Sequence, residues 1–274
     1  METSYGIVTQ SIKGKTVLKV DATSTAIGGA LIQYIGSQTA SGETEDAWMN
    51  SLITTWVAFV SDRVSVCTGS ADIYSQANRD YNIRNCAHIV AAREKLIPLH
   101  EDLGKVARGP LPLILTPSAN SNKYGIYHDE DAKPGLDVSR FTTLRRFKNI
   151  PGFYITNGRT FASPGSDYTY LQYRRVIDRA ATLLTIIAKQ FINAEFRVND
   201  NGTIYEVDAV TIEDKVTTYM MNDLKDSIVG LQVQVDRTIN LLSTQKLKIT
   251  ASVRPFGYAK FINLEVGFAP VVRA

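Results

Sequence analysis

The sequence predicts a mixed α+β and α/β fold, with a sheet covered by helices on one side. Its C-terminal part contains three segments in which apolar and polar residues alternate, as in strands that bury one face. Several segments before them repeat apolar residues at helical spacing. With 274 residues, 44% of them hydrophobic and 21% charged, the chain is long enough for one large domain or two small ones with an ample core.

The N-terminal half should alternate extended segments with helices. Residues 1–20 carry spaced apolar residues that suit a hairpin or an arm lying on another surface. Residues 43–60 are predicted to be a helix, because acidic residues in the first turn complement its dipole and an apolar stripe follows. A short strand over residues 63–68 and a second helix over residues 85–99 should come next.

The densest local pattern lies between residues 151 and 191. A β-prone run at residues 153–155 is flanked by glycine turns, and a helix is expected to begin near Tyr168 with Ser166 or Asp167 as its cap. Helical spacing places these residues on its apolar face: Tyr170, Tyr173, Ile177, Ala181, Leu184, Ala188 and Phe191. The opposite face should carry Arg175, Arg179, Thr182 and Lys189.

After this helix the pattern changes to hairpins and strands. Residues 199–202 read Asn-Asp-Asn-Gly, a turn sequence expected between two short strands. A helix over residues 212–224 should follow. Alternating runs at residues 231–235, 247–253 and 262–266 then predict three strands, each with one mainly apolar face.

The sequence offers little material for catalysis. Three histidines and two cysteines, Cys67 and Cys86, are scattered along the chain, whereas an active site usually gathers several titratable groups. We therefore predict that the protein is not an enzyme and has no cofactor. The run His128-Asp129-Glu130-Asp131 is of a type that can bind metals, but no second cluster accompanies it, so an exposed acidic loop is favoured over a metal site. The cysteines should be reduced and half-buried.

Charge and hydropathy exclude two further classes of partner. The net charge of +3 is too small to indicate nucleic acid, and the apolar runs are too short for a membrane span. No secretory signal is apparent, so folding in a cytoplasm is expected. Local basic clusters have two interpretations, namely solvated or intrachain-paired side chains and docking onto an acidic protein surface. These clusters comprise Arg140, Arg145, Arg146, Lys148, Arg174, Arg175 and Arg179.

Several motifs between about residues 100 and 268 occur in an order that is specific in combination. They read HEDLGKVARGPLP from His100, YHDED from Tyr127, PGLDVSRFTTLR from Pro134, GFYITNGRT from Gly152, GSDY from Gly165, YRRVIDRA from Tyr173, VDRTINLLSTQ from Val235 and PFGYAKFIN from Pro255. In this order they resemble the sheath proteins of contractile phage tails, tailocins and related injection systems.

The resemblance implies a sheath core domain with extended terminal arms. It suggests an N-terminal linking arm at residues 1–20, a core at residues 21–258 and a C-terminal linking strand at residues 259–274. Such subunits stack in rings around an inner tube, join their neighbours by strand exchange and contract to drive the tube through a cell envelope. Many sheath proteins are longer, which leaves open a minimal sheath protein or a truncated form.

Partners and location follow from the same resemblance. They would be other copies of the chain in a helical homo-oligomer, the inner tail tube protein, and the baseplate and tail terminator proteins, without nucleic acid or membrane insertion. The particle would be a virion tail or contractile particle assembled in the bacterial cytoplasm. A tail tube or baseplate structural protein is the alternative function.

Two sets of residues are candidates for the contacts. The inter-subunit strand would comprise Lys260, Ile262, Leu264 and Val266. A basic helix face would meet the tube or a neighbour through Arg175, Arg179 and Lys189.

Overall fold

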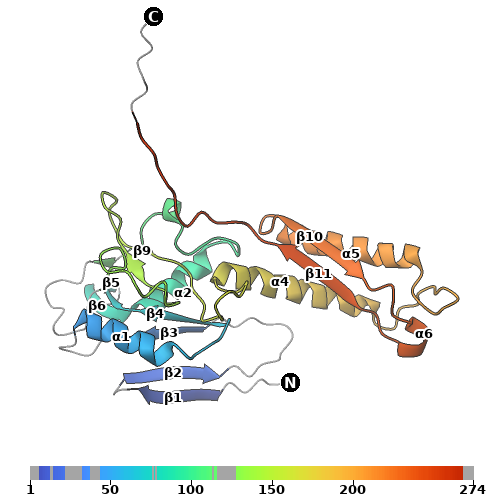
Figure 1. Ribbon diagram of the computed structural model, residues 1–274, viewed down its shortest axis with the longest axis horizontal. Coiled ribbons are helices and arrows are strands. Elements are labelled where there is room, and N and C mark those ends of the chain that lie inside the picture. Colours follow the sequence, from blue (N-terminus) through green and yellow to red (C-terminus); the bar gives the residue numbers. More distant parts are fainter. Residues whose placement is uncertain are drawn as a thin grey trace, which may run out of the picture.

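The computed structural model describes residues 6–12, 15–21, 33–37, 44–75, 77, 79–112, 114–115 and 128–267. It has an N-terminal part of small sheets and short helices and an elongated part built on two long helices (Figure 1). Three clusters of buried residues form the core, two in the N-terminal part and one in the elongated part. The predicted mixed fold is confirmed, although the strands are divided among several small sheets.

The chain enters the N-terminal part through a hairpin and a β-α-β unit. Strands β1 (Gly6–Ile12) and β2 (Lys15–Asp21) pair antiparallel, which is the hairpin alternative expected for this segment. Strands β3 (Gln33–Ser37) and β4 (Val64–Thr68) pair parallel, with α1 (Glu45–Trp56) between them. A parallel pair needs such a crossover, so the predicted helix followed by a strand is confirmed.

Helix α1 begins where the sequence provides a cap. Thr44 has extended backbone angles, and its hydroxyl oxygen accepts from the amide of Ala47 at 3.3 Å, while acidic residues occupy the first turn. The helix buries an apolar face against β4 and the segment around Phe161. The buried residues of this cluster are Trp48, Met49, Leu52, Trp56, Val64, Val66, Leu136, Phe141 and Phe161.

A second sheet and helix complete the N-terminal part. Strands β5 (Ser70–Ser75), β6 (Asp80–Asn85) and β7 (Ile114–Leu115) form an antiparallel sheet in the order β6-β5-β7. Helix α2 (Cys86–Leu96) confirms the second predicted helix, and the short 3₁₀ helix η1 (Val106–Arg108) follows it. Strands β8 (Leu144–Arg145) and β9 (Tyr154–Ile155) then pair antiparallel, with β9 inside the predicted run at residues 153–155.

Helix α4 (Leu171–Ala188) begins three residues later than expected, and η2 (Lys189–Phe191) extends it. Ser166 is not its cap, because the Ser166 hydroxyl accepts from the amide of Tyr168 in a turn before the helix. The position of the N-cap belongs to Tyr170, whose side chain makes no capping bond. Backbone pairing of Arg159 with Tyr170 keeps the chain extended up to that residue.

The buried face of α4 also differs from the prediction by one residue. Ala181 is exposed and Ile177 and Leu184 are only partly buried. The residues that do line the core of the elongated part from α4 are Val176, Ala180, Leu183 and Ile187. They keep the expected helical spacing but a different phase, since the phase is set by packing against α5 and β11.

The elongated part pairs α4 with α5 (Glu206–Leu224) and a two-stranded sheet. The predicted turn is confirmed, since Asn199 and Gly202 form it and Val198 pairs with Ile204 across it. Strands β10 (Gly230–Val235) and β11 (Ile249–Arg254) pair antiparallel, with the short helix α6 (Leu241–Thr244) between them. Both helices lie on one side of this sheet, as expected (Figure 1).

The third predicted strand has no partner in the described chain. Residues 255–267 are extended without strand pairing, and residues 261–267 stand away from the rest of the molecule (Figure 1).

Helix α5 begins six residues before the predicted start. Its first turn contains Glu206 and Asp208, acidic residues that suit a helix N-terminus.

Candidate assembly surfaces

The C-terminal segment first follows the core before it leaves. The Phe256 ring lies 5.2 Å from the ring of His100, and the Tyr258 hydroxyl donates to the carbonyl oxygen of His100. The Lys260 ammonium then donates to the carboxylate of Asp102 and, at 2.7 Å, to the side-chain oxygen of Asn157. The first residue of the predicted inter-subunit strand is therefore held by its own core.

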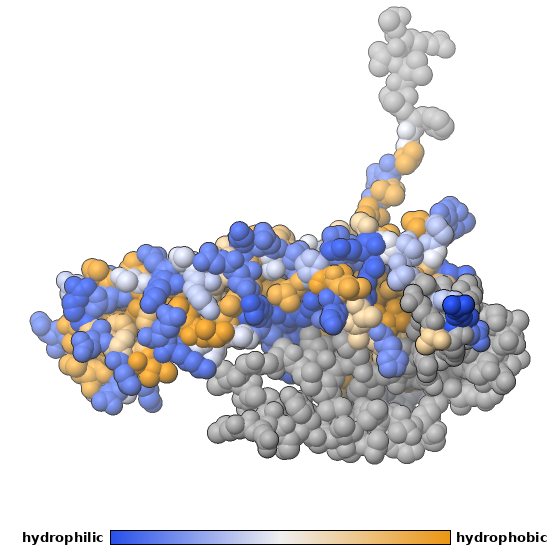
Figure 2. All heavy atoms as spheres, turned by 180° about the vertical axis from the view of Figure 1, so that it is seen from behind, coloured by the Kyte–Doolittle hydropathy of each residue, from blue (hydrophilic) through white to orange (hydrophobic). Residues whose placement is uncertain are grey.

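Beyond Lys260 the segment is exposed on both faces. The exposed fraction is 92% for Phe261, 75% for Ile262, 84% for Leu264 and 99% for Val266. Figure 2 shows hydrophobic residues along this segment, clear of the rest of the surface. An apolar strand without a partner at this exposure is the kind of surface that pairs with another chain.

Sheet β10-β11 provides a matching acceptor. Each strand pairs only with the other among the described residues. The outer edge of β10 is engaged at Val235, whose amide donates to Glu213 and whose carbonyl oxygen accepts from Arg237, so β11 offers the more open edge. The inner face of the sheet is covered, since Val233 and Val235 are buried in the cluster with α4 and α5. An added strand would extend this sheet and its covered face.

The predicted basic residues lie along α4 but differ in their surroundings. Arg175 is held within the chain, since it pairs with Glu94 at 2.7 Å and donates to the carbonyl oxygens of Ile97 and Pro98 at the end of α2. Arg179 forms a two-point ion pair with Asp223 of α5, with its Nε 2.8 Å from Oδ1. Lys189 is exposed and forms no ion pair with any described residue.

The other arginines of the predicted basic clusters have intrachain partners too. Arg140 donates to carbonyl oxygens at the end of α1 and around Phe161, while Arg145 pairs with Asp131 and Arg146 with Asp129. Arg174 is buried and pairs with Asp62 and Asp178, each at 2.9 Å. Intrachain pairing, one of the two interpretations of these clusters, thus holds for these four arginines.

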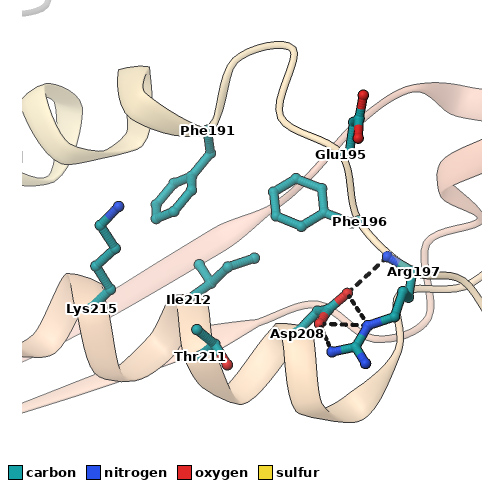
Figure 3. A pocket seen from close by; sticks show the side chains of 8 residues that line it. All are labelled: Phe191, Glu195, Phe196, Arg197, Asp208, Thr211, Ile212 and Lys215. Atoms are coloured by element: carbon teal, nitrogen blue, oxygen red, sulfur yellow. Dashed lines mark hydrogen bonds and ion pairs between the residues drawn. The ribbon is translucent and has the colours of Figure 1, made fainter.

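A pocket of about 620 Å³ opens between the end of α4 and the start of α5. Phe191, Phe196 and Ile212 form its apolar side, and Arg197 and Asp208 bind each other at its rim (Figure 3). The remaining lining residues are Glu195, Thr211 and Lys215. Arg197 lowers the pKa of Asp208 through their hydrogen bonds, so this carboxylate stays ionised and paired.

The acidic motif is buried, so the predicted exposed loop is wrong. His128, Asp129 and Glu130 are 5%, 6% and 7% exposed, and only Asp131 is at the surface. The His128 ring bonds Glu45 at 3.0 Å and Glu130 at 2.8 Å. Glu130 in turn accepts from the amide of Gly135 at 2.7 Å. These contacts join α1 to the 128–137 loop, and no group of three or more such side chains within the described ranges is arranged to hold a metal.

The cysteines are free, as predicted, but fully rather than half buried. Burial raises the pKa of the Cys86 thiol to about 12, and burial together with Cys86 raises the pKa of Cys67 further. Such thiols are poor nucleophiles. Of the helices in the described ranges, none combines the length and hydropathy that crossing a bilayer requires.

Several residues of these surfaces were not expected from the sequence. Asp102, Asn157 and Tyr258 lie within the motifs that carry the resemblance, but no local pattern shows that these motifs meet. Only the folded structure shows that these residues lie together around Lys260.

The chain is similar in sequence to a known family and to a phage protein. Residues 167–272 match the family described as DUF2586, C-terminal domain. The chain is 22% identical over 242 residues to a protein of Haemophilus phage HP1 (strain HP1c1) that is provisionally named a tail sheath protein. This match covers 86% of the chain and 61% of the relative, so the chain spans about three fifths of that relative's length.

Solved structures agree on the fold. The helical sheath of the anti-feeding prophage in its contracted state matches with a TM-score of 0.52 and 15% identity over 84% of this chain and 60% of that one. The contracted sheath complex of PVC, an extracellular contractile injection system, matches with a TM-score of 0.57 and 13% identity over 86% and 63%. The chain has the fold of a contractile sheath protein. The resemblance indicated by the sequence motifs is confirmed, and the sheath fold accounts for the mixed helices and small sheets.

Proposed function

We propose that the chain is a structural subunit of a contractile sheath, which polymerises helically around an inner tube and contracts to drive the tube through a cell envelope. The sheath fold, shared over more than four fifths of the chain with subunits of two contracted sheaths, carries this proposal. The role is structural rather than enzymatic. Its partners are other copies of the chain, the inner tube, and the baseplate and terminator proteins of a virion tail or contractile particle assembled in the host cytoplasm.

The linking element is the C-terminal strand. Ile262, Leu264 and Val266 share one parity and are exposed in the single chain, while β11 has an open outer edge. Adding this strand to the sheet of a neighbour would satisfy the backbone groups of both. The hairpin at the N-terminal end is proposed as the second linking element, and the region between the two as the core.

Contraction in this proposal uses conformational energy stored at assembly. Subunits held in an extended lattice rotate as near-rigid bodies into a tighter lattice that buries more surface, while the strands keep neighbours connected. Contact with the tube has to be weak enough to release. Exposed charges such as Lys189 suit such a contact. Charges at the rim of an interface orient the two partners but add little to their affinity.

Electron microscopy of the purified chain tests the function directly. Wide hollow helical tubes in negative stain are the expected result. Narrow tubes or closed rings would favour the alternative, a tail tube or baseplate structural protein. A discrete small oligomer at all concentrations would contradict both assignments.

Deleting residues 261–274 tests the linking strand. We expect a folded monomer that no longer polymerises, because the core keeps Lys260 while the exposed strand is lost. Circular dichroism checks folding and sedimentation velocity checks assembly. Sheath-like tubes from this deletion would refute the role of the strand.

A matched pair of substitutions tests which face of the strand is used. Leu264→Asp places a charge on the apolar parity and should abolish polymerisation, whereas Asn263→Asp adds the same charge to the adjacent polar position and should leave it intact. Equal effects of the two changes would show that charge alone, rather than strand pairing, explains the loss.

A further inference from the structure

The C-terminal segment has two parts with opposite properties. Phe256, Tyr258 and Lys260 pack on the core, and residues 261–267 are exposed. The Tyr258 ring lies 5.5 Å from the ring of Tyr173 on α4, and burial raises the pKa of Tyr258 to about 12. The segment changes from packed to exposed between Lys260 and Phe261.

Lys260 lies in a slot that the core has already shaped. Its ammonium contacts Asp102 and Asn157 and lies 4.4 Å from the centre of the Tyr170 ring. A cation over an aromatic face that also meets a carboxylate is held from several directions at once. The slot borders a groove of about 870 Å³ that also runs beside Phe256.

The acceptors in the slot are oriented by other parts of the core. Asp102 accepts from the amide of Gly104 at 2.7 Å and from the side-chain amide of Gln172 at 2.6 Å. Asn157 donates to Asp137 at 2.9 Å, which turns its side-chain oxygen towards Lys260. These bonds exist within the core, so the slot does not depend on the segment that fills it.

Charge balance gives Lys260 its importance. Asp102 is 8% exposed, and Lys260 is its ion-pair partner among the described residues. Withdrawing the lysine would remove the ion-pair partner of a buried carboxylate and leave only the longer-range charge of Arg159 beside it, which is unfavourable. The segment therefore remains attached to the core unless a comparable interaction replaces it.

We propose that residues 256–260 form a clasp, closed by Lys260 in the Asp102–Asn157 slot, that fixes where and in which direction the C-terminal strand leaves its own subunit. The strand available to a neighbour begins at Phe261 rather than at residue 259. The acceptors of the clasp, His100, Asp102 and Asn157, lie in the N-terminal part beside the start of α4, so tension on the strand reaches the core at Lys260. This inference rests on the proposed sheath function for its consequence, but not for the clasp itself.

Limited digestion of the full chain with chymotrypsin tests the clasp in the free subunit. This protease cuts after aromatic residues, and both Tyr258 and Phe261 are within the segment. In the wild-type chain, cutting after exposed Phe261 should far exceed cutting after Tyr258. Asp102→Asn, which leaves the cleavage sequence unchanged and can still accept from Gly104, should accelerate cutting after Tyr258 roughly tenfold, since local opening governs cleavage.

Two further variants control for fold and charge. Lys260→Met opens the clasp from the other side, while Asp102 keeps Gly104 and Gln172, and should give the same acceleration. Asp226→Asn removes an exposed carboxylate that makes no ion pair within the described part of the chain, and it should change nothing. An unchanged ratio of cuts after Tyr258 and Phe261 in Lys260→Met would overturn the clasp.

Assembly of the same variants tests its consequence. Chains with an open clasp should form fewer and shorter tubes than wild type under identical conditions, as judged by negative stain. Wild-type yield and length in both clasp variants would overturn the positioning role. If the wild-type chain itself fails to form tubes, the proposed function is refuted, while the digestion pattern still decides whether the clasp exists.

Discussion

Gly104 allows the loop that begins at His100 to approach β9 closely. A Cβ atom at this position would lie 2.3 Å from the carbonyl oxygen of Thr156, a distance that real contacts do not allow. The loop that begins at His100 can therefore lie directly on β9 only with glycine here. The same approach brings Asp102 beside Asn157 and so creates the slot for Lys260.

His128 is the residue from which a pH dependence follows. Burial alone would lower its pKa, but hydrogen bonds to Glu130 and Glu45 outweigh burial and raise it above its ordinary value. The folded pKa then exceeds the unfolded one of about 6.5. The contribution to stability is complete below the unfolded pKa and is lost as pH rises through the folded pKa.

We predict that the free energy of unfolding contains a His128-dependent part that declines as pH rises above about 6.5, by about 1.4 kcal/mol for each unit of pKa shift. His128→Gln should remove this part, and the exposed His88→Gln should leave it unchanged. Urea unfolding from pH 5.5 to 9 measures it. An equal pH dependence in wild type and His128→Gln would contradict the assignment.

The burial of the run His128-Asp129-Glu130 could not be predicted from its neighbours in sequence. His128 contacts Glu45 from 83 positions away, and four polar residues in a row are more often exposed than buried. The same limit applies to Lys260, whose partners in the slot lie 103 and 158 positions away. Motif order indicated the resemblance to sheath proteins, but it did not indicate these contacts.

At the scale of elements, local periodicity predicted most helices and strands. Helices α1, α2 and α5 and strands β4, β10 and β11 lie within or close to the expected ranges. The errors in α4 and α5 are errors of phase and boundary, whereas strands β5 and β6 were not predicted. Helix α4 starts at Leu171 because pairing of Arg159 with Tyr170 keeps the preceding chain extended, a contact between segments that periodicity does not contain.

The phase of α4 gives a direct test. Leu183→Ala should destabilise the fold by about 2–5 kcal/mol, because this side chain is 4% exposed within the core of the elongated part. Leu184→Ala removes the same atoms from the neighbouring, partly buried position and should cost clearly less. Thermal or urea unfolding compares the two. A larger loss for Leu184→Ala would restore the phase predicted from sequence.

At the scale of the whole molecule, charge distribution singles out Lys189 of the predicted basic residues. Arg175 and Arg179 are engaged with α2 and α5, whereas Lys189 is exposed at the end of α4. The proposed contact of this face with the tube or a neighbour thus depends most on Lys189. Arg175 and Arg179 contribute mainly by holding the helices together.

Lys189→Glu should weaken association of the subunit with tube protein by up to about fivefold per contact at low salt, with the difference shrinking as salt increases. Co-sedimentation with assembled tubes measures it, and the exposed Lys225→Glu serves as the control. Equal binding by the two variants at low salt would exclude Lys189 from the tube contact.

The continuity between β11 and the exposed strand has a mechanical consequence. The chain passes from Arg254 at the end of β11 into the clasp and then into the strand, with no other element between them (Figure 1). Tension that opens the clasp would therefore be passed to the end of β11, where Arg254 is paired with Gly230 of β10. In the proposed sheath, the six-residue ladder of β10 and β11 would thus be the next element to bear load after the clasp.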